Sequence, residues 1–347
     1  MDTTLIESRR NKILECIIET HIQTASPVGS HEVCRRYHLQ LSPATVRNVM
    51  GELEGETLVT HPHTSAGRVP TNRGYRFFVD SLMAPQRLSE AELRSIDALA
   101  REPQDGPVEL LRSAAHVAAV LSGQAGIALA PRLTQSALRR IELIPVDTHR
   151  VLGIIVTAEG LLKHSVLEFQ EVVDSQELAR LSRFLSEELD GETLGGVHEH
   201  LQHALMDASN AFNYLYRRAQ EFLELGGFLA HDVDLIIERV SHLLDQPEFR
   251  HAEQGRPLLA ALEAGTSFLA ALEQTIQHGR LRLVIGTENA GSGLSLCSIV
   301  SMPYRAGARL AGAIGVVGPA RMDYGRVVSI VDRVADVVSR GMSRFIV

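Results

Sequence analysis

The sequence is short of cysteine, has no long apolar run and carries no excess of positive charge. Its three cysteines, Cys16, Cys34 and Cys297, lie far apart without CxxC spacing, which argues against a disulfide framework and a thiolate zinc site. No apolar run approaches the roughly 20 residues that a membrane helix needs. Charged residues throughout the N-terminal segment exclude the apolar core of a signal peptide. We therefore expect a soluble protein of the cytoplasm.

The common catalytic and metal-binding motifs are absent as well. There is no GxSxG or HExxH motif, and the glycine-rich segment 286–293 lacks the spacing of a phosphate-binding loop. We interpret that segment as a tight connection between strands. His198, His200 and His203 are clustered, but offsets of two and five residues do not place all three on one helical face. We therefore expect neither an enzyme nor a bound cofactor or metal.

The net charge of −8 is unusual for a nucleic-acid-binding protein, so its distribution matters. Residues 1–80 contain nine Lys or Arg and nine Asp or Glu, so the whole negative excess lies in the rest of the chain. Within this neutral block, the segment 57–78 contains Arg68, Arg73 and Arg76 and no acidic residue. A local cationic segment attracts a phosphate backbone even when the whole chain is acidic.

Three helices are predicted at the N-terminus. Isoleucine and leucine recur at helical spacing over residues 6–22, which indicates an amphipathic first helix that ends before Pro27. A short second helix is expected at 30–37. Ser42 is a suitable N-cap and Pro43 suits the first helical position, so a third helix is expected to start there.

The third helix is the candidate for reading DNA bases. It would bury an apolar face and expose polar side chains near its N-terminus, among them Thr45, Arg47 and Asn48. Such side chains on the second helix of a helix-turn-helix reach base edges. A solvated helix face is the alternative.

A β-hairpin is predicted directly after this helix. Residues 58–60 and 68–70 have strand character, and the intervening HTSAG segment has turn character. Helices followed by a hairpin predict a winged helix. The tip of the wing would offer Arg68, with neutral histidine and hydroxyl side chains, to phosphates or a minor groove.

The residues around this hairpin resemble a known family. The run PHTSAGRVPT at 62–71, followed by GYRFFVD at 74–80, resembles the signature of the heat-inducible transcription repressor (HrcA) family. The run LSPATVRN at 41–48 is similar to the recognition helix of the same family. The chain departs from the family at Glu56 and Thr57, where a glycine is usual at the helix-to-strand turn. The candidate DNA-binding residues are Ser42, Thr45, Arg47, Asn48, His63, Thr64, Ser65, Arg68, Arg73 and Arg76.

The acidic remainder of the chain contains both helices and strands. A capping box at Ser89 and Glu92 opens a linker helix. Strands are predicted at 151–156, 161–169, 281–285, 294–300 and 311–317, and a final helix at 327–338. Strands flanked by helices predict an α+β protein.

The segment between the two groups of strands has a different pattern. Apolar residues recur at alternating spacings of four and three, which is typical of a coiled-coil seam. The candidate dimerisation residues are Leu201, Leu205, Phe212, Leu215 and Phe222. Packing against a neighbouring helix of the same chain is the alternative, because so short a seam does not require a second chain.

The resemblance extends to the C-terminal part, through Ile285-Gly286 with Glu288-Asn289 and through the run at 314–324. It implies an α+β multidomain protein with an N-terminal winged helix-turn-helix and a GAF-like α/β domain that contains an inserted helical dimerising domain. The expected boundaries are 1–83 for the winged helix, 84–106 for the linker helix, 107–174 with 251–347 for the GAF-like domain, and 175–250 for the inserted domain.

The same resemblance implies a function. A homodimer would bind an inverted-repeat DNA operator, repress class I heat-shock chaperone operons and be kept active by the GroEL chaperonin. The alternative is a winged-helix regulator controlled by a small-molecule or metal effector in the C-terminal domain. Arg321, Asp323 and Tyr324 could line such a pocket, but we favour a structural role in which an Arg–Asp pair caps the last helix.

Overall fold

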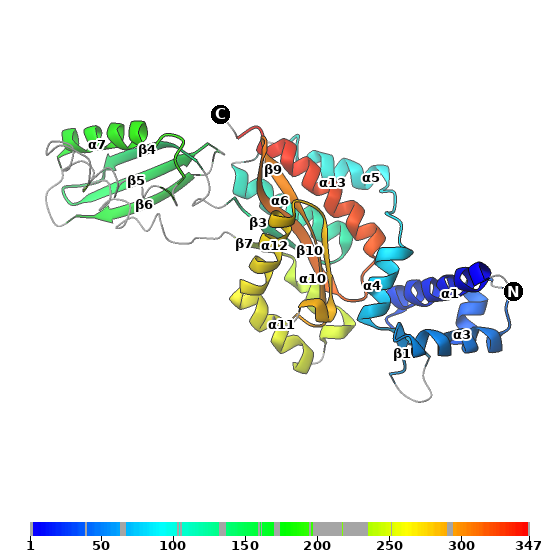
Figure 1. Ribbon diagram of the computed structural model, residues 1–347. Coiled ribbons are helices and arrows are strands. Elements are labelled where there is room, and N and C mark those ends of the chain that lie inside the picture. Colours follow the sequence, from blue (N-terminus) through cyan, green and yellow to red (C-terminus); the bar gives the residue numbers. More distant parts are fainter. Residues whose placement is uncertain are drawn as a thin grey trace.

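The computed structural model combines helices with three β-sheets, as the α+β prediction requires (Figure 1). It describes residues 3–38, 40–62, 67–102, 104, 106–131, 137–158, 160, 162–169, 174–193, 196, 217, 235–250, 252–289 and 294–345. Three parts follow one another in space, here called the N-terminal unit, the central domain and the insert. None of the helices in the described ranges is long and apolar enough to cross a bilayer.

The N-terminal unit consists of helices and one short hairpin. Its elements are α1 (Thr3–Thr24), α2 (Ser30–Tyr37), α3 (Pro43–Gly55), β1 (Val59–Thr60), β2 (Val69–Pro70) and α4 (Asn72–Ser81). The predicted start of the third helix is confirmed, because the Ser42 hydroxyl accepts the Thr45 N–H at 3.1 Å. Fully buried aliphatic side chains of α1 and α3 form the core, among them Ile13, Leu14, Ile17, Val46 and Leu53.

The turn between α3 and β1 places a residue other than glycine in a left-handed conformation. Thr57 has a φ of 62°, in the left-handed region that glycine adopts most readily. The backbone is held there by the Thr57 N–H bond to the Glu54 carbonyl at 2.9 Å and the Leu58 N–H bond to the Leu53 carbonyl at 2.9 Å. The turn is therefore closed by backbone hydrogen bonds although a threonine occupies it.

A linker helix, α5 (Glu90–Ala98), connects this unit to the rest of the chain. The predicted capping box is present, with the Ser89 hydroxyl accepting the Glu92 N–H and the Glu92 carboxylate accepting the Ser89 N–H at 2.7 Å.

The central domain is a five-stranded antiparallel sheet in the order β7-β3-β10-β9-β8. Its strands are β3 (Ala125–Leu129), β7 (Leu235–Glu238), β8 (Arg282–Ile285), β9 (Cys297–Ala306) and β10 (Arg309–Pro319). The helices α6 (Pro107–Ser122) and α13 (Tyr324–Met342) pack on one face. On the other face lie α10 (Val240–Leu244), η2 (Pro247–Phe249), α11 (Ala252–Ala264) and α12 (Thr266–His278). The strands predicted at 281–285 and 311–317 and the final helix are confirmed, whereas the strand predicted at 294–300 begins at Cys297 and runs on to Ala306.

Both faces of this sheet are buried, which explains the continuous apolar runs of its strands. On β3, Ile127 packs with the α12 side and Ala128 with the α13 side, and both are fully buried. A strand covered on two faces has little reason to alternate between apolar and polar residues.

The insert is a separate three-stranded antiparallel sheet in the order β4-β5-β6. Its elements are β4 (Leu138–Pro145), β5 (Arg150–Thr157), β6 (Leu162–Glu168) and α7 (Ser175–Glu188). Helix α7 covers one face, and the Ser182 and Ser186 hydroxyls donate to the Ile141 carbonyl at 2.8 and 2.9 Å. The hairpin predicted at 151–169 is confirmed, but β6 alternates between exposed and covered residues rather than being fully buried.

The predicted boundaries of the insert are therefore wrong. Residues 138–168 were assigned to the GAF-like domain, yet their strands share no hydrogen bonds with the five-stranded sheet. Conversely, β7 was assigned to the inserted helical domain, but it pairs with β3 in the central sheet. The local pattern of a strand does not reveal which sheet it joins. Leu201, Leu205, Phe212, Leu215 and Phe222 lie outside the described residues.

Candidate nucleic-acid interface

Helix α3 presents two polar side chains to solvent near its N-terminus. Arg47 and Asn48 are exposed, and within the described ranges neither side chain makes a hydrogen bond or ion pair with the protein. The half-buried Thr45 hydroxyl lies 2.9 Å from the Ser42 hydroxyl, which itself caps the helix. Arg47 and Asn48 are thus free to contact DNA, whereas Ser42 and Thr45 also shape the helix end.

Arg68 lies at the base of the hairpin rather than at its tip. Its side chain is 15% exposed, and one guanidinium nitrogen lies 2.9 Å from a Glu54 carboxylate oxygen of α3. Its backbone pairs with Val28, N–H to carbonyl, at 2.8 and 2.9 Å. A Cβ on the preceding Gly67 would lie 2.4 Å from the Val28 carbonyl, so only glycine allows this approach. The predicted exposed position of Arg68 is therefore wrong, because an acid on α3 and the α1–α2 loop hold it.

Glu54 joins the recognition-helix candidate to the hairpin. One carboxylate oxygen lies 2.5 Å from His61 Nδ1 and the other contacts Arg68. The hairpin base is thereby fixed relative to α3 by two polar contacts. His63, Thr64 and Ser65, predicted at the tip, lie outside the described residues.

Further cationic side chains surround α3. The exposed Arg73 donates to the Thr57 hydroxyl at 3.1 Å, and its side chain makes no other hydrogen bond or ion pair within the described ranges. Arg35 and Arg36, in the last turn of α2, are also exposed and were missed by the sequence interpretation. The sequence pattern could have indicated them. The first helix of a helix-turn-helix crosses the DNA backbone, where two adjacent arginines can bind phosphates.

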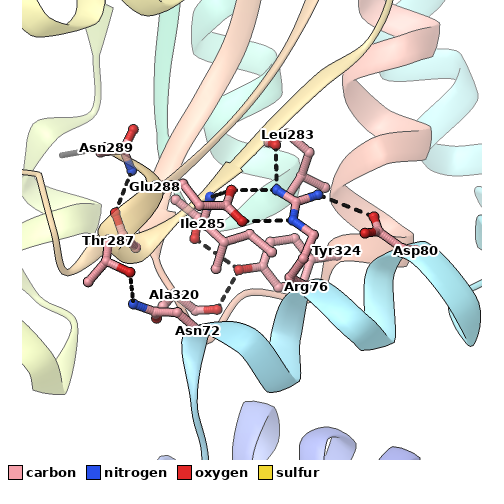
Figure 2. A network of polar contacts seen from close by, with 12 residues as sticks. Asn72, Arg76, Asp80, Leu283, Ile285, Thr287, Glu288, Asn289, Ala320 and Tyr324 are labelled. Atoms are coloured by element: carbon pink, nitrogen blue, oxygen red, sulfur yellow. Dashed lines mark hydrogen bonds and ion pairs between the residues drawn. The ribbon is translucent and has the colours of Figure 1, made fainter. Parts of the chain in front are cut away.

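Arg76 faces the central domain instead of solvent (Figure 2). Its guanidinium donates to both Glu288 carboxylate oxygens, at 2.8 and 2.5 Å, and to the Leu283 carbonyl at 2.7 Å. The bonds to Glu288 raise the pKa of Arg76. Burial acts to raise the pKa of Glu288, but the bonds from Arg76 and the Ile285 N–H outweigh it and the pKa is lowered. In this structure Arg76 uses its donors on the central domain and on Asp80 of its own helix, so its place in the predicted DNA-binding set stays a prediction.

A second domain contact lies beside the first. Tyr75 of α4 meets Tyr324 of α13 with ring centroids 5.9 Å apart in an edge-to-face arrangement, and its hydroxyl lies 2.7 Å from His21 Nδ1. Burial lowers the pKa of His21 to about 4, and the neighbouring Arg321 acts in the same direction while Glu248 opposes it. His21 is therefore neutral at physiological pH.

The expected Arg–Asp pair at the last helix is only half correct. Asp323 caps α13 by accepting the Arg326 N–H at 3.2 Å. Arg321 instead donates to Glu248 at 2.5 Å and to the Ile22 carbonyl of α1 at 2.8 Å. It is therefore a further bond between the N-terminal unit and the central domain.

A metal centre has no support in the described part of the chain, where no group of three or more His, Cys, Asp or Glu side chains could hold an ion. His198, His200 and His203 lie outside that part.

Comparison with known proteins gives concordant matches. The family model "HrcA protein C terminal domain" matches residues 108–328. The heat-inducible transcription repressor HrcA of Geobacter sulfurreducens is 37% identical over 335 residues, covering 96% of this chain and 97% of the relative. The protein of the same name from Syntrophobacter fumaroxidans is 35% identical over 337 residues, covering 96% and 97%. A crystal structure described as that of a hypothetical protein has a similar fold, with a TM-score of 0.67 at 24% identity, covering 97% of this chain and 98% of the other.

Proposed function

Because this chain belongs to the HrcA family of heat-inducible transcription repressors, which are not enzymes, we propose that it represses chaperone operons by binding an inverted-repeat operator as a homodimer. In this proposal the N-terminal unit acts as a winged helix and the central domain is GAF-like. Because its target is the chromosome, the repressor would work in the cytoplasm.

The observation that carries the proposal is the free pair Arg47 and Asn48 on α3. They stand on the second helix of a helix pair, and a hairpin follows. This order supports insertion of α3 into a major groove, where Arg recognises guanine and Asn recognises adenine through paired hydrogen bonds. Arg35, Arg36 and Arg73 would hold the phosphates on either side.

A homodimer suits an inverted repeat because a two-fold protein places two α3 helices on two equivalent half-sites. Dimerisation through the apolar seam at 201–222 remains our prediction. Replacing Leu205 and Leu215 with Asp should produce monomers that keep a folded N-terminal unit but bind the operator weakly, because each half-site must then be bound independently. The matched control is Leu259→Asp, on an exposed position of α11.

The direct test is titration of the purified protein against a duplex carrying an inverted repeat from its own upstream region. The same duplex with one half-site scrambled, and a random duplex, serve as controls. We expect tight binding to the repeat, much weaker binding to the single half-site and the weakest binding to random DNA. Equal affinity for all three duplexes would contradict the proposal.

Regulation by a chaperonin requires a separate experiment. The folded fraction of a marginally stable repressor falls as the temperature rises, so this fraction can serve as the heat signal. A chaperonin binds the apolar surface that the unassembled chain exposes. Adding GroEL with its nucleotide should raise the active fraction measured by stoichiometric operator titration, and excess unfolded competitor should reverse the gain. An active fraction indifferent to both additions would refute this part while leaving DNA binding intact.

A further inference from the structure

Two sequence signatures that lie 212 residues apart meet in one contact (Figure 2). The GYRFFVD run supplies Arg76 on α4, and the segment that follows β8 supplies Glu288. We propose that Arg76 and Glu288 are positioning residues for operator binding. Their contact sets the orientation of α3 relative to the central domain, and thereby the half-site spacing that the dimer accepts. This inference rests on the proposed function.

Both members of the Arg76–Glu288 ion pair are held in position by further hydrogen bonds. The Glu288 carboxylate accepts the Ile285 N–H at 2.8 Å, which fixes it against the end of β8. The Arg76 guanidinium meets it with two parallel N–H bonds and also reaches the Leu283 carbonyl of the same strand. A paired guanidinium and carboxylate fix direction as well as distance. The contact can therefore define an angle between the two parts.

Contacts on both sides of the pair extend the interface. Asn72, one helical turn before Arg76, donates to the Thr287 hydroxyl at 3.1 Å. Gly286 has a φ of 52°, and a Cβ there would lie 2.4 Å from the Asn72 amide. With Tyr75 against Tyr324, three residues in the first two turns of α4 contact the central domain. A single half-exposed ion pair would contribute little, but this set acts together.

Helix α4 is in turn rigidly attached to α3. A Cβ at Gly74 would lie 2.0 Å from the Leu58 carbonyl, so the two backbones are in direct contact. The Leu58 N–H bonds to the Leu53 carbonyl at the end of α3. The N-terminal cap of α4, Thr71, donates to the Thr57 carbonyl at 2.6 Å. A rotation of α4 on the central domain would therefore carry α3 with it.

The consequence concerns the second half-site. Once one α3 is bound, the other reaches its half-site at an effective concentration that depends on how well the geometry matches the spacing. A fixed α3 gives high affinity at one spacing and low affinity at others. A loosened α3 accepts more spacings, at lower affinity for the correct one.

The experiment measures affinity on three duplexes: the native operator, an operator whose half-sites are moved apart by about half a helical turn, roughly five base pairs, and a single half-site. The variants of the full-length protein are Arg76→Ala, Glu288→Gln and the double variant. Asp80→Asn is the matched control, because Asp80 contacts Arg76 at 3.3 Å from within α4 and forms no hydrogen bond or ion pair with the described part of the central domain. Circular dichroism verifies folding, and the near-isosteric Glu288→Gln keeps the test open if Arg76→Ala fails to fold.

We expect each single variant to lose affinity for the native operator by about tenfold, with single half-site affinity unchanged. The preference for native over altered spacing should fall, the double variant should be no worse than either single one, and Asp80→Asn should match the unchanged protein. Unchanged or tighter operator binding would overturn the inference, as would an equal loss on the half-site, which would make Arg76 a direct DNA contact. Failure of the unchanged protein to prefer the repeat would instead defeat the proposed function itself.

Discussion

Two arginines on the helices that flank the hairpin, Arg47 on α3 and Arg76 on α4, have opposite surroundings. On α3, Arg47 is exposed and makes no bond to the described part of the protein. On α4, Arg76 is bound by Glu288 and by a backbone carbonyl of another domain. Arg68, between the two helices, is held by Glu54. The difference shows that the nearest acid in space, rather than the nearest in sequence, decides whether an arginine is offered to a ligand.

That comparison also separates two requirements of DNA recognition. A side chain that reads a base must be able to form hydrogen bonds with the edge of that base, so it should not be bonded to acceptors of the protein. A positioning side chain needs the reverse, a partner that holds it before the ligand arrives. In the proposed function Arg47 on α3 has the first task and Arg76 on α4 the second, so variants of the two residues should behave differently.

The largest expected effect comes from paired glycine substitutions on the two helices. Gly74→Ala forces a Cβ to 2.0 Å from the Leu58 carbonyl, so the N-terminal unit should lose about 3 kcal/mol or more in free energy of unfolding. Gly51→Ala on α3 meets nothing within 4 Å and should gain about 0.5–1 kcal/mol. Native-state hydrogen exchange of the α1 amides measures both in the full chain. Similar effects of the two changes would contradict the tight packing of α4.

Next in size is Arg47→Ala. If Arg47 reads a base edge, its removal should cost about 1–3 kcal/mol of operator binding and relax selectivity at one base pair. Titration against the operator and against the duplex substituted at each position measures this. The control is Arg94→Ala on α5, where Arg94 is 72% exposed and pairs only weakly with Glu90. An equal loss on operator and random DNA would remove Arg47 from the base-reading role.

A smaller effect is expected at Thr57, in the turn between α3 and β1. Thr57→Gly should stabilise the N-terminal unit by about 1 kcal/mol, because Thr57 adopts a φ of 62° that a β-branched residue tolerates poorly. The loss of the Arg73 bond to the Thr57 hydroxyl offsets part of this gain. Thermal unfolding of the two proteins provides the comparison, and a lower midpoint for Thr57→Gly would show that the hydroxyl contact outweighs the backbone strain.

The smallest effect at neutral pH concerns His21. Its pKa falls from 6.5 to about 4 on folding, mainly through burial, with Arg321 contributing and Glu248 opposing. The unfolded chain therefore binds more protons between these values, so this group contributes full stability above pH 6.5 and loses it as the pH falls toward 4. His21→Gln should flatten that fall in unfolding midpoint, while the exposed His31→Gln should not. Equal pH profiles for all three proteins would contradict this account.

The local features of the fold could be predicted from sequence, and the long-range ones could not. The Ser42 cap and the Ser89 capping box follow from residues three positions apart, and both are confirmed. The role of Arg76 depends on Glu288, which no local pattern connects to it. The sequence also did not predict that β4, β5 and β6 form a sheet of their own. Alternation of apolar and polar residues indicates which face of a strand is buried, but not which element covers that face.

Strands β3 and β7 are neighbours in the central sheet, and this determines where the chain can accept or lose a whole domain. The polypeptide leaves the central sheet after β3 and returns as its immediate antiparallel neighbour, with Leu129 opposite Leu235. The whole insert therefore occupies the place of a hairpin turn. A folded domain tolerates additions at such a point, because neither strand has to move. A gene that joined the two strand ends through a short Asn-Gly turn should encode a protein that keeps the five-stranded sheet and lacks the insert.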